Sequence, residues 1–187
     1  MALSGGRTPA TMLTVLAALD VPWRHLTVFQ VDERVAPDGD PARNSLLLEV
    51  LPLRTSQVRL MPVTAKHLGA AAARYARSLP DRFDVVHLGV GDDGHTASWP
   101  PGDPVVDSPR PVDLCGTYRG HVRMTLTPSL VNAARARLVL ATGADKAEPV
   151  RDWLLGKESL PLQRVRRTAT TVVLDAAAAT LLPLAAD

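Results

Sequence analysis

The segment with the highest density of reactive side chains is Gly-Val-Gly-Asp-Asp-Gly-His-Thr-Ala-Ser at residues 89–98. Its three glycines allow the backbone to wrap closely round a ligand, and histidine accepts protons near neutral pH. His95 is therefore a candidate general base, whose tautomer a neighbouring carboxylate can fix. Free N–H groups of the same loop are candidates to stabilise an oxyanion. The alternative is a turn with His95 on the surface, but the density of polar groups favours chemistry.

Neither a metal site nor a second catalytic histidine is expected in this segment. A lone histidine beside carboxylates lacks a second nitrogen ligand at a defined spacing, so we predict that this segment binds no metal ion. His87 lies inside the apolar run that precedes the loop. It is interpreted as a packed core residue.

A second segment, Ser4-Gly5-Gly6-Arg7-Thr8-Pro9, has the composition of a phosphate-binding turn. The glycines permit a sharp turn and close approach to a ligand. The helix expected to follow offers free N–H groups and the positive end of its dipole, and hydroxyls add donors. A plain strand-to-helix turn is the alternative.

Three further groups of polar residues follow apolar runs. Asp32-Glu33-Arg34 directly follows a predicted strand, where a carboxylate can orient a base, although a solvated turn is the alternative. Asn44 is either a polar site group or a helix cap. Lys146, in Gly-Ala-Asp-Lys, and Arg123 are candidate phosphate ligands, although each alone is more often a surface charge.

Short apolar runs alternate with longer helical patterns along the chain. Strands are predicted at 26–31, 83–88, 121–126, 138–142 and 171–174, and helices at 9–19, 45–51, 64–79, 128–132 and 144–155, with a long irregular connection at 99–120. This alternation predicts a three-layer α/β fold, a mostly parallel sheet with helices on both faces, in one domain over 1–187. Ligands bind beyond the carboxyl ends of such strands, so residues 4–8, 32–34, 89–96 and 143–146 should meet at one edge.

Composition excludes several classes of protein. Apolar residues make up 46% of the chain, enough for a sizeable core, and the formal charge is only +2 without clustered Lys/Arg, which argues against nucleic-acid binding. No run approaches the ~18 apolar residues of a membrane span, so no membrane partner is expected. The single cysteine, Cys115, allows no internal disulfide and predicts a cytoplasmic location.

Taken together, the spaced motifs resemble the 6-phosphogluconolactonase family. The matching segments run in order through residues 4–9, 32–35 with Asn44, 88–98, 123–127 and 143–146. The resemblance implies a fold shared with glucosamine-6-phosphate deaminases and ribose-5-phosphate isomerases. It also implies hydrolysis of 6-phosphogluconolactone to 6-phosphogluconate in the pentose phosphate pathway, without metal or organic cofactor. The expected partner is a small phosphorylated sugar lactone, and homo-oligomerisation stays open.

Carried over by position, the resemblance assigns a role to each motif residue. His95 is the implied base, with Asp32, Arg34 and Asp93 shaping the catalytic site, and which carboxylate supports His95 stays open. Substrate or phosphate binding is implied for Ser4, Gly5, Gly6, Thr8, Asn44, Gly91, Gly94, Arg123 and Lys146.

Two departures from the family pattern qualify these expectations. The chain begins inside its first predicted strand, whereas family members usually carry a leading segment, so an N-terminally shortened fold is expected. Trp99-Pro-Pro stands where the family usually has Leu-Phe-Pro. Because Trp99 still supplies a large apolar group, we expect the packing there to survive.

Two other functions compete with lactone hydrolysis. An amino-sugar-phosphate deaminase or isomerase has the same fold, but deaminases typically have an acidic residue after the histidine, which His95-Thr-Ala-Ser-Trp-Pro-Pro lacks. A non-catalytic sugar-phosphate sensor would keep the pocket without turnover, and the intact His95 argues against it.

Overall fold

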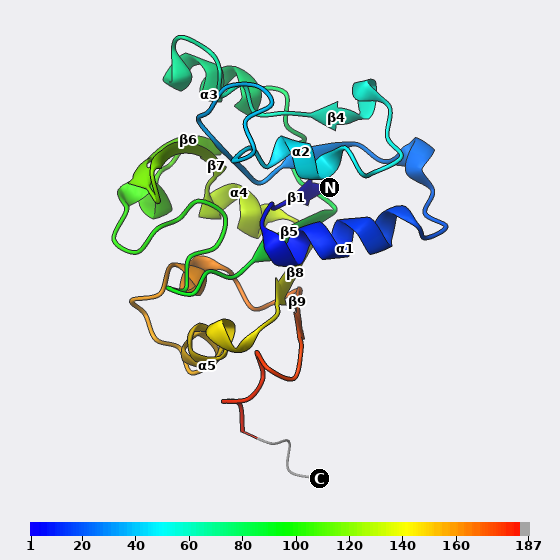
Figure 1. Cartoon of the computed structure of the whole chain (residues 1–187). Helices are drawn as coiled ribbons and strands as arrows, with labels where there is room; N and C mark the ends of the chain where they lie inside the picture. The colour runs from blue at the N-terminus through cyan, green and yellow to red at the C-terminus, as the bar shows by residue number, and fades with distance from the viewer. Residues whose placement is uncertain (184–187) are drawn as a thin grey trace.

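The computed structural model describes residues 1–183 and centres on a six-stranded sheet whose paired strands are all parallel (Figure 1). In spatial order its strands are β4 (Val58–Arg59), β2 (Val28–Gln30), β1 (Ala2–Leu3), β5 (Val85–Gly89), β8 (Ala136–Ala141) and β9 (Thr170–Leu174). The predicted mostly parallel α/β sheet is confirmed. Since all six strands run the same way, their carboxyl ends share one edge.

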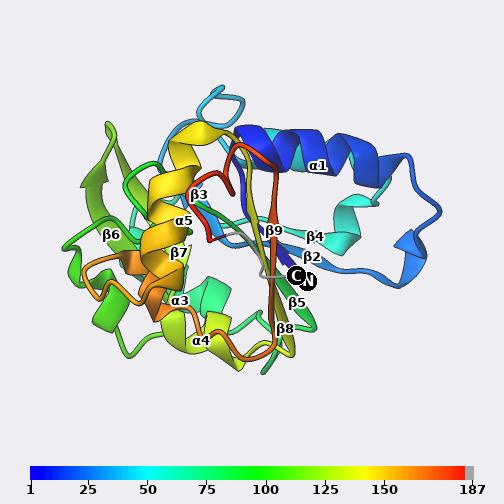
Figure 2. The same ribbon diagram turned by 90° about the horizontal axis from the view of Figure 1, so that it is seen from below.

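Helices cover both faces of this sheet (Figure 2). One face packs against α1 (Arg7–Ala17) and α2 (Ser45–Leu48), and the other against α3 (Leu68–Ala76), α4 (Pro128–Ala133) and α5 (Ala147–Leu154). Strand alternation explains the division, because successive side chains point to opposite faces. In β2, Val28 joins the smaller apolar cluster under α1, whereas Phe29 joins the larger one. No helix within residues 1–183 is both long and apolar enough to cross a membrane.

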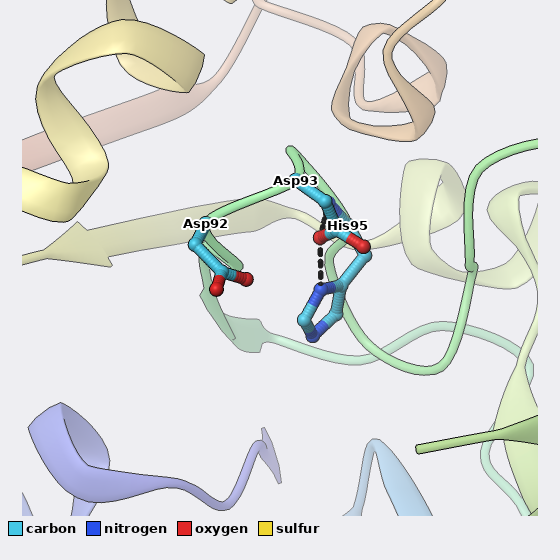
Figure 3. Close-up of side chains that lie close together, drawn as sticks. All are labelled: Asp92, Asp93 and His95. Atoms are coloured by element: carbon cyan, nitrogen blue, oxygen red, sulfur yellow. Dashed lines mark hydrogen bonds and ion pairs between the residues drawn. The ribbon is translucent and has the colours of Figure 1, made fainter.

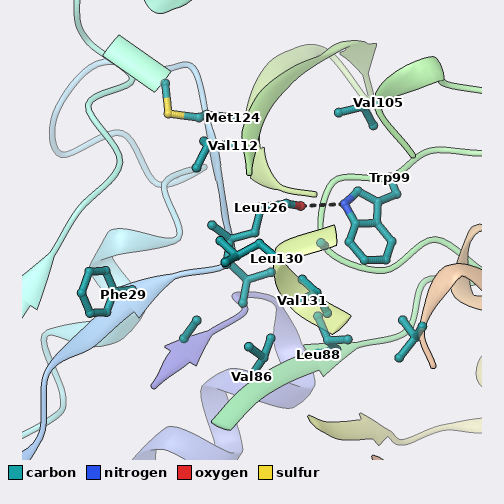
Figure 4. Packing of buried hydrophobic residues seen from close by; sticks show 14 of the residues in the cluster. Phe29, Val86, Leu88, Trp99, Val105, Val112, Met124, Leu126, Leu130 and Val131 are labelled. Atoms are coloured by element: carbon teal, nitrogen blue, oxygen red, sulfur yellow. Dashed lines mark hydrogen bonds between the residues drawn. The ribbon is translucent and has the colours of Figure 1, made fainter. Parts of the chain in front are cut away.

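The larger apolar cluster includes residues of both the parallel sheet and the helices α3, α4 and α5, and Figure 4 shows part of it. Val86 and Leu88 of β5 face it, together with Leu126 and Val131. Trp99 is fully buried there and its indole Nε1 donates to the carbonyl of Leu126 at 2.8 Å. The expectation that Trp99 preserves the packing is confirmed, since both its rings and its one donor are satisfied.

A second sheet, absent from the sequence prediction, lies beside the first. It is antiparallel, in the order β3 (Asp32–Arg34), β7 (His121–Leu126) and β6 (Val112–Tyr118). The 99–120 connection is therefore not irregular throughout, and Asp32–Arg34 is a short strand instead of a turn. The hydrogen bonds to β7, distant in sequence, stabilise β3 where local pattern gives no strand signal.

Some predicted helix boundaries were wrong. The helix predicted at 64–79 begins only at Leu68, and the one predicted at 144–155 divides into a 3₁₀ turn, Ala144–Lys146, followed by α5. Helix α1 begins at Arg7, two residues before the predicted Pro9. Its N-cap is Gly6 at φ 114°, a conformation that side chains disfavour, so this glycine sets the start of the helix.

Candidate active site

A cavity of about 590 Å³ opens at the carboxyl ends of β1, β5 and β8, as expected for a parallel sheet. It brings together the four segments that the sequence pattern grouped. Its walls include Ser4, Gly5, Gly6, Thr8, Asp32, Arg34, Gly91, His95, Thr96, Ala97, Arg119, Thr142, Gly143 and Lys146.

One end of the cavity has the properties of an anion-binding site. The 4–6 turn delivers the N-terminus of α1 to it, where backbone N–H groups and the helix dipole favour negative charge. The Ser4 hydroxyl is buried without a hydrogen-bond partner among the described residues. Lys146 lies across the opening, its Nζ 2.9 Å from the Asp145 carboxylate, and the hydroxyls of Thr8 and Thr142 are 2.7 Å apart. This end offers the cations Arg7 and Lys146, the hydroxyl of Ser4 and backbone donors.

The other end holds His95, whose imidazole is fixed by Asp93. Its Nδ1 lies 2.6 Å from Asp93 Oδ1, and the backbone N–H of His95 donates to the same oxygen at 3.1 Å (Figure 3). Asp92 and Asp93 are both neighbours of His95 in sequence, but only Asp93 bonds to its ring. The Tyr118 hydroxyl donates to Asp93 Oδ2 at 2.5 Å. Asp93 is thus held on both oxygens, and Nε2 of His95 is the ring nitrogen left for a ligand.

The electrostatics of this group favour an ionised Asp93 and a protonated Tyr118. Partial burial works to raise the pKa of the Asp93 carboxyl, but hydrogen bonds from His95 and Tyr118 outweigh it and hold that pKa well below its ordinary value. Burial, reinforced by the Asp93 carboxylate, raises the pKa of Tyr118 to about 12. At neutral pH the phenol therefore keeps the proton that it donates.

Two glycines make room for these side chains. A Cβ at Gly91 would lie 1.9 Å from Nδ1 of His95, and a Cβ at Gly5 would lie 1.9 Å from Oδ1 of Asn44. Both distances are far below any real contact, so the site requires glycine at each position. Gly94 has φ 79° and a Cβ there would meet Leu160, which explains the third glycine of the loop.

The Asp32–Arg34 strand divides its charges between the cavity and the interior. Asp32 borders the cavity and accepts the hydroxyl of Ser98 at 2.6 Å, and the Arg34 Nη1 donates to Asn44 Oδ1 at 2.5 Å. Glu33, fully buried, points the other way. It accepts from the Gln30 side chain and from the backbone N–H groups of Arg34, Asn44 and Ser45, and it pairs with Arg43 at 3.1 Å. Glu33 therefore supports the strand while its neighbours face the ligand space.

Four residues that the sequence assigned to the site lie behind the cavity wall. Asn44 braces Gly5 and donates to the backbone carbonyl of Asp32 at 3.0 Å, and Asp93 stands behind His95. Gly94 faces Leu160. Arg123 is buried, and its Cζ lies 5.1 Å from the centre of the Tyr118 ring. Arg123 is not among the residues that line the cavity.

Sequence reasoning missed Tyr118, Arg119 and Thr142. Arg119 lines the cavity and forms an ion pair with Asp92, and Tyr118 bonds to Asp93. One signal was available, because Tyr-Arg-Gly-His between two alternating patterns is typical of a two-residue hairpin loop. Thr142 ends the predicted strand at 138–142 and could have been placed at the cavity by the same edge rule as Gly143.

The three residues Asp92, Asp93 and His95 each present a ligand atom within 4.8 Å of the others, the spacing of a metal site. The two carboxylates already have partners, however. Asp92 pairs with Arg119, and Asp93 bonds to His95 and Tyr118. A cation would have to displace these partners, so the geometry suits an acid–base group better than a metal site.

Known proteins are similar to this chain over most of its length. The family model of the glucosamine-6-phosphate isomerases/6-phosphogluconolactonase matches residues 1–174. A 6-phosphogluconolactonase of Streptomyces coelicolor is 37% identical, over 97% of this chain and 81% of that protein. Another, from Synechocystis, is 32% identical over 78% of this chain and 67% of that protein.

Solved structures share the fold. The 6-phosphogluconolactonase of Thermotoga maritima superimposes with a TM-score of 0.83 at 28% identity, covering 92% of this chain and 83% of that one. A monomeric glucosamine-6-phosphate deaminase, at 23% identity and a TM-score of 0.82 over 96% of this chain and 87% of that one, shares the fold alone. On the family match and the identity to its relatives, this chain belongs to the glucosamine-6-phosphate isomerase/6-phosphogluconolactonase family.

Proposed function

We propose that this chain hydrolyses the ring ester of 6-phosphogluconolactone, with His95 as the general base. Lactone hydrolysis follows from family membership together with relatives named 6-phosphogluconolactonase at 32–37% identity over most of the chain. The observation that supports the role of His95 is the bond from its Nδ1 to Asp93, which leaves Nε2 for a water molecule in the cavity. The reaction is a step of the pentose phosphate pathway.

In the proposed mechanism, Nε2 of His95 takes a proton from a water molecule as its oxygen attacks the lactone carbonyl. The carbonyl oxygen becomes an oxyanion. Backbone N–H groups of the loop at residues 89–98, here called the Gly-rich loop, stabilise it together with the guanidinium of Arg34. Collapse of this intermediate breaks the ring C–O bond. The imidazolium returns its proton to the departing ring oxygen, and the product is an open-chain carboxylic acid, which ionises to the carboxylate by releasing its proton to solvent.

The phosphate group is assigned to the other end of the cavity. The 4–6 turn, Thr8 and Lys146 supply hydroxyl, N–H and ammonium donors, which match the ligand preferences of a phosphate dianion. The negative charge of Asp32 would repel a phosphate. Asp32 is therefore assigned to the sugar hydroxyls, from which a carboxylate can accept hydrogen bonds. We further propose that the protein acts in the cytoplasm, which is consistent with its single cysteine.

The test is a coupled assay in which phosphogluconate dehydrogenase consumes the product of freshly made lactone. The lactone also opens unaided in water, so a blank without enzyme sets the baseline. The wild type should exceed the blank, and His95→Ala should lower kcat by about 10²-fold or more with little change in product affinity. A wild-type rate equal to the blank would contradict the proposal.

A matched variant separates binding from chemistry. Lys146→Ala should mainly raise KM, by about tenfold, because a phosphate handle acts equally in the ground state and the transition state. Ammonia release from glucosamine 6-phosphate by the wild type would instead support a deaminase, and tight binding of 6-phosphogluconate without turnover would support a sensor.

A further inference from the structure

The hairpin of β6 and β7 ends on the Gly-rich loop, at a residue that the proposed function leaves without a role. Tyr118 pairs with His121 across the hairpin, and the two loop residues between them, Arg119 and Gly120, have φ values of 48° and 85°. Positive φ at both loop positions is the geometry of a type I′ turn. The non-glycine Arg119 is strained there, by about 1 kcal/mol. The tip is thus held in one defined conformation.

Tyr118 and Arg119 are both attached to carboxylates of the Gly-rich loop at 89–98. The Tyr118 hydroxyl donates to Asp93 Oδ2 at 2.5 Å, and Arg119 pairs with Asp92. The rings of Tyr118 and His95 meet edge to face, with their centres 5.2 Å apart. The guanidinium carbons of Arg119 and Arg123 lie 5.2 Å and 5.1 Å from the centre of the Tyr118 ring. Tyr118 therefore has contacts on its hydroxyl and on its ring.

The hydrogen-bond pattern at Asp93 is consistent with only one tautomer of His95. The Tyr118 hydroxyl gives its one proton to Asp93, so towards Nδ1 of His95, 3.1 Å away, its oxygen can only accept. The ionised carboxylate of Asp93 also only accepts. Nδ1 faces two acceptors and must carry the proton. The lone pair of the neutral ring then lies on Nε2.

We propose that Tyr118 is a positioning residue for lactone opening, whose hydroxyl holds Asp93 and thereby keeps His95 in the tautomer with a free Nε2 lone pair. The proposal rests on the proposed function for its kinetic part. Tyr118 is not among the residues that line the cavity, so it acts through Asp93 and His95 and not by touching the lactone.

Removing the hydroxyl frees one oxygen of Asp93 and the carboxylate can rotate away from the ring. Tyr118→Phe should therefore lower kcat by about tenfold, the worth of one charge-assisted hydrogen bond, while KM changes less than twofold. The matched control is Tyr75→Phe, which removes the other phenol of the chain. The Tyr75 hydroxyl bonds to the backbone of Gln30 and Arg59, far from the loop. Its loss should lower stability without changing kcat.

The second measurement is independent of turnover. Long-range ¹H–¹⁵N NMR spectra distinguish a protonated ring nitrogen from one with a lone pair, and His95→Gln assigns the His95 signals among those of the five histidines. At pH 8 the wild type should show a protonated Nδ1 and a free Nε2. Tyr118→Phe should shift both signals towards the average of the two tautomers.

Several outcomes would overturn the proposal. A wild-type spectrum with the proton on Nε2 does so without any variant, and it applies even if Tyr118→Phe fails to fold. A folded Tyr118→Phe variant with unchanged kcat and unchanged His95 signals would also overturn it. An equal loss of kcat in Tyr75→Phe would have the same consequence. If the wild type opens no lactone, the proposed function fails, while the spectra still decide whether Tyr118 sets the tautomer.

Discussion

Two histidines lie eight residues apart in the chain, His87 on β5 and His95 in the loop that follows, and their surroundings differ in every respect. His87 is 1% exposed, and neither of its ring nitrogens has a partner among the described residues. His95 has one nitrogen bound to Asp93 and borders a cavity. Residue type is the same at both positions. The hydrogen-bond partner and the access to ligand decide which imidazole can do chemistry.

The pKa of His87 follows from the same contrast. Burial lowers it from 6.5 to about 4, with no neighbouring charge among its causes. The ring stays neutral in the folded protein under ordinary conditions. Unpartnered polar atoms in a core are destabilising by about 1–3 kcal/mol, so His87 lowers stability where His95 supplies reactivity.

The largest effect is expected from moving His95 without changing it. Gly91→Ala places a Cβ where Nδ1 of His95 now lies, so the ring must leave its position against Asp93. We expect kcat to fall by about 10²-fold, comparable to loss of the base. The melting temperature should change little, because the loop can move into the cavity. Retention of normal kcat would show that the ring position is not needed.

An intermediate effect is expected from changing the partner. Asp93→Asn keeps the shape but removes the charge, and its amide can also donate to Nδ1 and favour the wrong tautomer. We expect about a tenfold fall in kcat. Asp92→Asn is the matched control, since Asp92 is the residue before Asp93 and bonds to Arg119, not to the His95 ring. Equal losses in both variants would contradict the assignment of Asp93 as the partner.

The smallest effect on activity, and the clearest on stability, is expected at His87. Between pH 6.5 and 4 the unfolded chain binds a proton at His87 that the folded chain does not, so stability falls as pH falls. The loss reaches about 3 kcal/mol near pH 4.

His87→Leu should remove that part of the pH dependence, measured as denaturant unfolding at several pH values, and should leave kcat unchanged. Parallel curves for the variant and the wild type would contradict the assignment. The pKa of the Asp93 carboxyl is lowered on folding, so Asp93 changes stability only at pH values below the ordinary pKa of an aspartate. The contributions of His87 and Asp93 therefore fall in different pH ranges.

Much of this architecture was predictable from sequence, because it depends on chain order and strand polarity. Ser4, His95 and Lys146 follow parallel strands, so they meet at one edge wherever the neighbouring helices begin. The choice of Asp93 over Asp92 was not predictable. Asp92 and Asp93 lie three and two positions before His95, and only the folded shape of the loop determines that Asp93 reaches the ring.

The pairing of β3 in the antiparallel sheet was not predictable either. Its pairing joins Asp32 to Thr125, ninety-three positions later in the chain. Local propensity carries no information about such a contact. Tyr118 was missed for the same reason, since its role depends on where the hairpin tip meets the loop after β5.

The buried carboxylate of Glu33 has a consequence for how this molecule fluctuates. Its oxygens hold the amide protons of Arg34, Asn44 and Ser45, which border the 35–43 segment at both ends. Those three protons can exchange with deuterium only when the carboxylate loses its donors, which is costly inside the protein. Their exchange should therefore be as slow as that of β5, while the amides of the exposed residues Asp38 and Gly39 between them exchange quickly. The fully buried carboxylate of Glu33 thus separates rapidly exchanging amides of the loop from the slowly exchanging backbone that carries Asp32 and Arg34.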